Sequence, residues 1–249
     1  IFLMQMFGNQ AQEKFIAGGI MDKIKEIDLN NFEVKELNKI LQKRDGNNFN
    51  HFNIINPMGA HAIATGLDAD IEVKIDGHVG YYCAGMNQNS EITIHGNAGV
   101  GVAENMMSGK VFVKGDASQS AGATGHGGLL VIEGNASARC GISMKGIDIV
   151  VKGSVGHNSA FMAQSGNLVI CGNAEDGLGD SIYETTIFIK GEFGNLGADC
   201  VEKEMKKDHF ERLEILLKRA NIKDDPKKFK RLGSARKLYN FDVKNSGNY

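Results

Sequence analysis

One glycine recurs at an unvarying interval, and this constrains the chain more than any other feature of its sequence. The interval is 19 residues, without insertion or deletion, and the seven copies are Gly77, Gly96, Gly115, Gly134, Gly153, Gly172 and Gly191. A fixed period of this length is typical of repeat proteins, in which one short structural unit stacks on the next. We therefore expect one structural unit for every 19 residues.

Each unit contains an alternating apolar pattern just before its glycine. Two positions before the glycine stand Ile75, Ile94, Val113, Ile132, Val151, Ile170 and Ile189, and four positions before it stand Val73, Ile92, Val111, Leu130, Ile149, Leu168 and Ile187. Alternation with period two predicts one β-strand per unit. Seven positions after the glycine the residue is always alanine or glycine, which predicts a tight corner.

A single unit of this size cannot bury its own apolar column. Stacking the units at the inter-strand distance of about 4.8 Å places each aliphatic side chain on the equivalent one of the next unit. We therefore predict an all-β protein, a right-handed parallel β-helix with 19-residue coils over residues 53–198. The glycine column must then serve a shared corner that needs either a positive φ or a close approach of two backbones.

The segments outside the repeat predict one extension at each end. Residues 1–52 form an N-terminal extension with a short helix over 34–44. Residues 199–222 predict a C-terminal capping helix that begins at Asp199, with Glu202 three residues on, and plugs the open end of the β-helix. Residues 223–249 form an irregular basic tail.

Charge is unevenly divided between the body and this tail. The tail holds eight basic and three acidic side chains, which leaves twenty basic and twenty-seven acidic for residues 1–222. Because the tail also carries acidic and aromatic residues, we interpret it as a segment that docks on an acidic body or partner rather than one that binds nucleic acid.

Four cysteines, Cys83, Cys140, Cys171 and Cys200, include no Cys-x-x-Cys pair. Their spacing predicts no zinc or iron–sulfur site, and we expect reduced thiols in the core. The sequence contains neither a basic leader with a cleavage site nor an apolar run of about 18 residues. We therefore expect a cytoplasmic protein without a membrane segment.

Other candidates for chemistry have a simpler structural explanation. The glycine-rich segment 120–128 runs into a predicted strand rather than a helix, so a coil corner is favoured over a phosphate loop. Glu104 and Asp180 share a column but lie four coils apart, about 19 Å, too far for a glycosidase pair. A catalytic β-helix of the polysaccharide-lyase kind needs clustered acids and a basic catalyst on consecutive coils, and the repeat lacks them. We expect no catalytic, cofactor-binding or metal-binding residue, and we expect the methionines at 86, 106, 107, 144 and 162 to pack mainly inside.

Several segments of the repeat resemble a known family. They are residues 59–68, 80–87, 103–109, 122–146, 179–184 and 197–205, of which the longest reads GATGHGGLLVIEGNASARCGISMKG. They are similar to the glycine-repeat (GXGXG) domain at the C-terminus of the glutamate synthase large subunit. They are more similar still to its separately encoded form in archaeal-type glutamate synthases and methylglutamate synthase. One of the subunits of formylmethanofuran dehydrogenase is a more distant match. The resemblance spans about residues 33–222.

The resemblance implies a β-helix that takes no part in the reaction. In that family, a separate module with an N-terminal cysteine nucleophile releases ammonia from glutamine, and a barrel module with FMN and iron–sulfur clusters makes the product. This chain begins with Ile1, so we expect that nucleophile to be absent from it. The resemblance thus implies a hetero-oligomer in which this chain holds an amidotransferase-like and an FMN and iron–sulfur synthase-like subunit in register, for glutamate or N-methylglutamate formation. The alternative is a scaffold of a formylmethanofuran-dehydrogenase-like complex.

For such a scaffold, the residues of interest lie in the turns. Tyr81, Tyr82, Arg139 and Lys145 are the candidates for an interface, and the terminal extensions are candidate docking segments. Arg139 and Lys145 flank the predicted corner at Gly141 and would attract an acidic partner or an anionic ligand.

Overall fold

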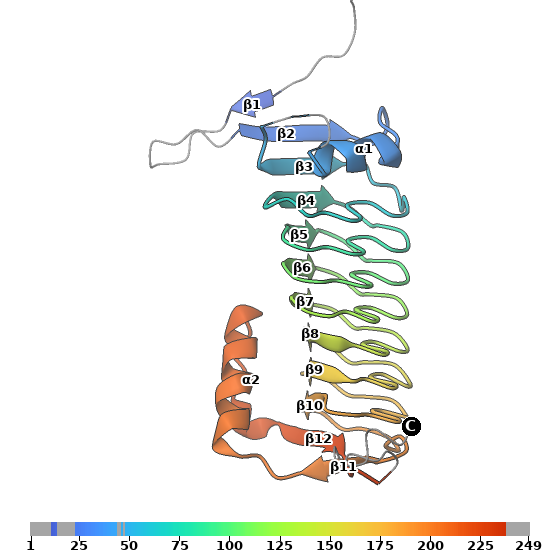
Figure 1. Ribbon diagram of the computed structural model, residues 1–249, viewed down its shortest axis with the longest axis vertical. Helices are drawn as coiled ribbons and strands as arrows, with labels where there is room; N and C mark the ends of the chain where they lie inside the picture. Colours follow the sequence, from blue (N-terminus) through green and yellow to red (C-terminus); the bar gives the residue numbers. More distant parts are fainter. Residues whose placement is uncertain (1–10, 14–22, 44–45, 47, 238–249) are drawn as a thin grey trace, which may run out of the picture.

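The computed structural model describes residues 11–13, 23–43, 46 and 48–237, and it confirms the parallel β-helix (Figure 1). In these residues nine strands pair in parallel and in chain order, so that each coil contacts the coil before and after it. The strands are β2 (Lys23–Asp28), β3 (His51–Ile55), β4 (Glu72–Asp76), β5 (Glu91–Ile94), β6 (Lys110–Val113), β7 (Leu129–Ile132), β8 (Lys145–Val151), β9 (Ser165–Ile170) and β10 (Thr186–Ile189).

The core is built from the alternating aliphatic residues of these strands. In β4 the side chains alternate between exposed and buried, with Val73 and Ile75 buried. Val73 is in register with Ile92 of β5, and Ile75 with Ile94, so the inward columns stack residue on residue. Burying an aliphatic side chain of this size stabilises the fold by about 1.5–3 kcal/mol. The same two columns continue in register through β10.

The repeat glycines are required by close backbone approach. From Gly115 onward, each donates its N–H to the carbonyl of the preceding repeat glycine, at 2.9–3.1 Å. A Cβ atom on Gly153 would lie 2.6 Å from the carbonyl oxygen of Gly134, and one on Gly172 would lie 2.6 Å from the carbonyl carbon of Gly153. Positive φ is the exception, because it occurs in this column only at Gly77.

Beside the glycine column runs a second ladder, formed by the residue that directly follows each glycine. Each side chain accepts the backbone N–H of the equivalent residue on the next coil. The acceptors are His78, Asn97, Asp116, Asn135, Ser154 and Asn173, and their distances run from 2.7 to 3.0 Å. Backbone groups at this corner are thereby satisfied without a regular strand.

The turns beyond this corner use left-handed backbone at regular intervals. From Gly77 to Gly172, positive φ falls five, seven and nine residues after the glycine. In the coil that follows Gly134 these residues are Arg139, Gly141 and Ser143, with φ of 60°, 70° and 52°. Their N–H groups donate alternately to the next, the previous and the next coil, at 2.8–2.9 Å. From Gly77 to Gly172, the small residue seven positions after each glycine thus combines a positive φ with a buried position.

The N-terminal end is closed by helix α1 (Val34–Leu41), which confirms the expected short helix (Figure 1). Leu37 and Leu41 are buried on the first coils. The side-chain amides of Asn38 and Gln42 donate to the carbonyls of Ala62 and Thr65, at 2.8 and 2.9 Å, and so satisfy backbone groups of the terminal turn. Strand β2 adds a coil inside the expected extension, and β1 (Ala11–Glu13) pairs antiparallel to it.

The C-terminal helix exists, but its expected place at the open end is wrong. Helix α2 (Lys207–Arg219) lies along the outer side of the last strands (Figure 1). The cause is the outward side chains of β7–β10, which are apolar there and form a second core with the helix. That core contains Leu129, Val131, Val150, Val169, Cys171, Phe188, Leu213, Leu216, Leu217, Ala220 and Phe229.

Two short strands close the C-terminal end instead. Residues expected to start the helix form β11 (Cys200–Lys203), and β12 (Lys230–Ser234) inserts antiparallel between β10 and β11. Asp199 does not begin a helix, because its carboxylate accepts hydrogen bonds from Ser234 Oγ, at 2.5 Å, and from the N–H of Lys237, at 3.0 Å. The tail is therefore not irregular over its described part, in which a short 3₁₀ turn η1 (Pro226–Lys228) precedes β12.

This part of the tail docks on the body through two ion pairs, one of which has the polarity that the basic charge of the tail predicts. Lys190 Nζ lies 2.6 Å from Asp224 Oδ2, and Arg236 Nη2 lies 2.7 Å from Glu184 Oε1. One pair therefore places a tail carboxylate on a body lysine, and the other places a tail arginine on a body carboxylate.

Replacing a repeat glycine tests the backbone contact. We expect Gly153→Ala to lower the free energy of unfolding by about 3 kcal/mol, because the methyl group would meet the Gly134 carbonyl, which cannot move away without breaking the ladder. Gly59→Ala is the control, since a Cβ there meets no atom within 4 Å and only its φ of +72° is unfavourable. That strain costs about 1 kcal/mol. Denaturant unfolding measures both, and an equal loss in the two variants would contradict the role of close approach.

Truncating α2 tests the second core. Leu213 is buried against the sheet, so we expect Leu213→Ala to cost about 2–5 kcal/mol and to speed amide hydrogen exchange in α2. Ile215 on the same helix is 57% exposed, and Ile215→Ala should stay within about 0.5 kcal/mol of the parent protein. If the two variants exchange and unfold alike, α2 is not held by this face.

Candidate functional site

The predicted interface residues all lie on the turn face, by which we mean positions 4–11 after each repeat glycine. Tyr81 is 54% exposed and stacks on His61, with ring centroids 4.0 Å apart and planes inclined by 27°. Its N–H also donates to His61 Nδ1 at 3.1 Å. These two contacts fix the ring at the surface, so its exposed face is presented in a defined orientation.

Tyr82 bridges two parts of the turn face. Its φ of 60° places it in the left-handed region. The ring lies over Gly85, where a Cβ atom would come within 2.6 Å of a ring carbon. The hydroxyl accepts a long hydrogen bond, 3.4 Å, from the amide of Asn105 on the next coil. The ring therefore connects the first part of its own turn to the later part of the next.

Arg139 and Lys145 are exposed on either side of the corner at Gly141. Their backbone N–H groups donate to His157 and Gly125, at 2.9 and 2.7 Å, so the backbone that carries them is fixed. Among the residues that the structure describes, neither side chain forms an ion pair. Tyr82 and Arg139 share one column but lie three coils apart, about 14 Å.

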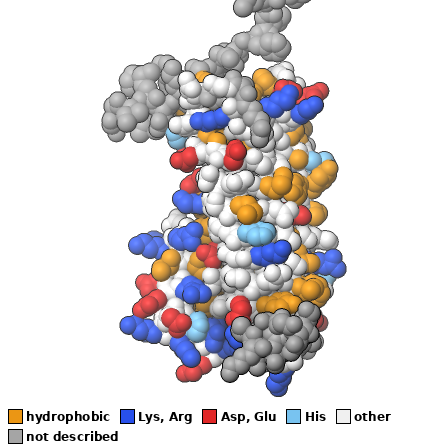
Figure 2. Space-filling model, viewed as in Figure 1, with side chains coloured by type: hydrophobic (Ala, Val, Ile, Leu, Met, Phe, Trp, Pro, Cys, Tyr) orange, Lys and Arg blue, Asp and Glu red, His pale blue; other side chains and the backbone are white. Residues whose placement is uncertain are grey.

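Sequence reasoning missed several apolar residues on this face. The expectation that the methionines pack inside is half right: Met106 and Met144 are buried, whereas Met86, Met107 and Met162 are 43%, 47% and 39% exposed. Val100, beside Tyr81 in the same column, is 47% exposed. The distance of each methionine from its repeat glycine distinguishes the two groups. A side chain ten residues after the glycine points inward, whereas those nine and eleven residues after it point outward. Figure 2 shows hydrophobic side chains gathered on the side of the molecule formed by the turns.

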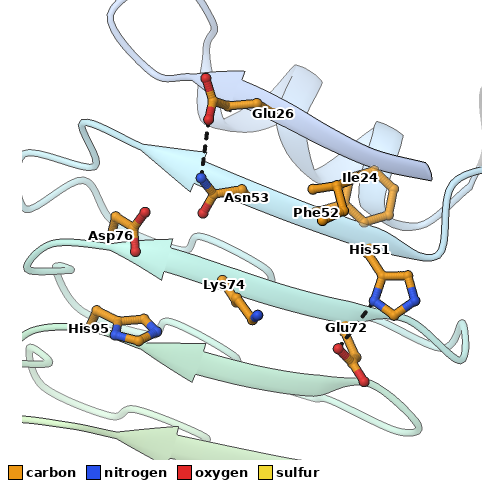
Figure 3. A pocket seen from close by; sticks show the side chains of 9 residues that line it. All are labelled: Ile24, Glu26, His51, Phe52, Asn53, Glu72, Lys74, Asp76 and His95. Carbon is orange, nitrogen blue, oxygen red and sulfur yellow. Dashed lines mark hydrogen bonds and ion pairs between the residues drawn. The ribbon is translucent and has the colours of Figure 1, made fainter. Parts of the chain in front are cut away.

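A second candidate is a hollow of about 400 Å³ on the outer face of β2–β5, the half of the sheet that α2 does not cover (Figure 3). Figure 3 shows Lys74 at its middle, with Asp76 and His95 to one side and Glu72 and His51 to the other. His51 Nδ1 lies 3.1 Å from Glu72 Oε2, and the Asn53 amide donates to Glu26 at 3.2 Å. The remaining lining is Ile24 and Phe52.

This hollow holds charges of both signs on a solvated strand surface. Lys74 is exposed and forms no ion pair with a described residue, so its charge is available to a ligand or partner. No three His, Cys, Asp or Glu side chains of the described residues are arranged to hold a metal ion. The arrangement can bind polar groups, but it does not aim several groups at one reacting atom, as a catalytic site must.

The four cysteines are free and buried, as the sequence predicts. Burial raises the pKa of each thiol to about 12; Asp224 and Asp199 add to the effect at Cys171 and Cys200. A thiol is nucleophilic only as its thiolate, so these groups are held in the unreactive form at neutral pH. The segment 120–128 forms the turn that leads into β7, as expected of a coil corner.

Fold and surface together define a class of protein: a parallel β-helix, closed by its own terminal segments, that presents an apolar and basic turn face. Protein GlxC of Rhizobium meliloti (strain 1021) is 57% identical over 225 residues, which cover 90% of this chain and 99% of the relative. The chain belongs to the GlxC family. No protein-family model and no solved structure matches it. None of the helices in the described residues is long and apolar enough to cross a membrane.

The thiols predict a specific dependence on pH. The folded-state pKa of about 12 lies above the ordinary value of 9.0, so the folded protein keeps protons that the unfolded chain loses. The stability that these thiols contribute is thus complete below pH 9 and is lost as pH rises from 9 towards 12. We expect Cys83→Ala/Cys140→Ala to flatten this decline in denaturant titrations, and a thiol reagent to modify the parent protein only after unfolding. Rapid modification of Cys83 or Cys140 in the folded protein would contradict the prediction.

Proposed function

We propose that this protein is a non-catalytic structural subunit of a glutamate-synthase-type oxidoreductase complex. It would hold an amidotransferase-like subunit and an FMN and iron–sulfur synthase-like subunit in register, for the formation of glutamate or N-methylglutamate. The cofactors would belong to the partner subunits, and the complex would be a cytoplasmic hetero-oligomer.

The observation that carries the proposal is the unbroken ladder from β2 to β10. Successive coils are hydrogen-bonded at the strand from β2 to β10, and from Gly96 onward also at the glycine corner and in the turn. A body joined in this way cannot bend at one coil without breaking several of these bonds, which suits it to keeping two partner sites at a fixed distance. An intermediate such as ammonia passes between sites efficiently only if their separation and orientation are fixed.

The match to GlxC fits a subunit of this kind, because it covers 90% of this chain and 99% of GlxC. The two partner subunits are proposed from the resemblance of residues 33–222 to the glycine-repeat domain of glutamate synthase. The buried thiols of Cys83 and Cys140 are protonated and therefore do not act as nucleophiles.

Purification of the tagged chain from its own cells tests the proposal. We expect an amidotransferase-like chain and a flavin and iron–sulfur chain to co-elute in fixed proportion, with the visible absorbance of both cofactors. The chain freed from its partners should be colourless and inactive with glutamine and 2-oxoglutarate.

Two outcomes would contradict this assignment. Co-elution with molybdenum or tungsten proteins would favour the formylmethanofuran-dehydrogenase-like scaffold. Turnover of a small substrate by the isolated, colourless chain would show that it is an enzyme in its own right.

A further inference from the structure

Exposed apolar side chains are concentrated on two consecutive coils. Eight large hydrophobic residues of the described chain are exposed, and four of them, Tyr81, Met86, Val100 and Met107, follow Gly77 and Gly96 on the turn face. Met58, Met162, Val201 and Ile215 are distributed over other parts of the fold. Single exposed hydrophobic residues are ordinary, whereas a contiguous group marks an interaction site.

Backbone contacts arrange the four residues as two pairs on neighbouring coils. The N–H of Tyr82 donates to the carbonyl of Val100 at 2.8 Å, which places Tyr81 and Val100 on neighbouring coils. Met107 donates its N–H to Asn87, the residue after Met86, also at 2.8 Å. The Tyr82 ring joins the two pairs, because it spans from its own turn to Asn105. We call Tyr81, Tyr82, Met86, Val100 and Met107 the tyrosine–methionine patch.

A basic edge lies two coils beyond the patch, on the coil that follows Gly134. Lys145 lies in the column of Met107, two coils or about 10 Å further on, with His126 exposed between them. Arg139 lies in the column of Tyr82. Over positions 4–11 of these four coils, Glu104 is the one carboxylate, against the fixed cations Arg139 and Lys145, which have no ion-pair partner among the described residues.

We propose that the tyrosine–methionine patch and its basic edge form one docking site for a partner protein that presents an apolar centre flanked by carboxylates. The inference rests on the proposed function and names the surface through which this chain would bind a partner subunit. Tyrosine and methionine are enriched at interface centres, and an adaptable thioether fits an irregular partner surface. The facing surface of the partner is expected to be acidic, because cations there would be repelled by Arg139 and Lys145.

Charge-insertion variants of the full chain test the site. Val100→Glu/Met107→Glu places two carboxylates in the patch, and Ile215→Glu is its control at a similarly exposed apolar residue on α2. Arg139→Glu/Lys145→Glu reverses the edge, and Lys218→Glu/Lys228→Glu is its control at exposed lysines elsewhere. The probe is the amidotransferase-like or flavin-containing subunit that co-elutes with the parent chain. Circular dichroism and thermal unfolding establish that each variant is folded.

We expect the patch variant to raise the dissociation constant by about 30-fold or more, the range of an interface hot spot. The edge variant should slow association and flatten its dependence on salt. Both controls should stay within about two-fold of the parent chain, as expected for residues outside the interface.

Each alternative result has a distinct meaning. If the parent chain binds its partner and the patch variant binds equally well, the docking site is elsewhere and the structural-subunit proposal stands. If the parent chain has no partner, the proposed function and this site fail together. Sedimentation that shows self-association of the parent chain, lost in the patch variant, would overturn the acidic partner in favour of a second copy.

Discussion

Direct backbone contact between successive coils at the glycine corner is the constraint on which the rest of this fold depends. With the Gly134 carbonyl 2.6 Å from where a Cβ of Gly153 would stand, only glycine allows the coils to stack at the inter-strand distance. That distance places Val73 on Ile92 and Ile75 on Ile94 in the core. A wider corner would separate the inward columns and forfeit their packing, because dispersion contacts decline steeply with small gaps. The insertion-free period follows, since one extra residue would move every later side chain out of its column.

The regular turns require strained, left-handed backbone, and hydrogen bonds between neighbouring coils offset the cost of that strain. Non-glycine residues in left-handed backbone, such as Arg139 and Ser143, each cost about 1–2 kcal/mol relative to ordinary conformations. The alternating direction of their N–H groups lets each coil donate both upward and downward, so that turn backbone is satisfied by its neighbours rather than by water. The consequence for function is a turn face with a fixed backbone, on which exposed side chains such as Tyr81 and Met107 have defined positions.

The repeat could be predicted because its cause is local and recurs, whereas the ends depend on contacts between distant segments. The 19-residue spacing was sufficient for the strands, the corner and the burial of Cys83. The position of α2 could be predicted only from the outward side chains of the strands. Val131, Val150 and Val169 occupy the column in which the earlier coils carry Lys74 and Thr93. This change from polar to apolar side chains predicts that another element covers the later coils. Strand β12 carried no such signal, because its pairing is antiparallel and joins residues about 40 positions apart. For the turn face, the inward direction of Met106 and the outward direction of Met107 follow from their positions, 10 and 11 residues after Gly96, once the left-handed residues of the turn are known.

The two ends of the β-helix differ in what they leave uncovered, and this gives the molecule a direction. Around β7–β10 the chain covers its own sheet with α2 and pairs the last strand with β12, so the apolar outward surface is already buried. Around β3–β5 the outer sheet face is not covered by α2 and is polar, with the hollow around Lys74, while the turn face of the same region carries the tyrosine–methionine patch. Apolar surface in water is unfavourable, and a fold that buries it at one end with its own helix has the means to do so at the other. This asymmetry supports the proposal that another protein covers the exposed patch, at a position set by the number of coils.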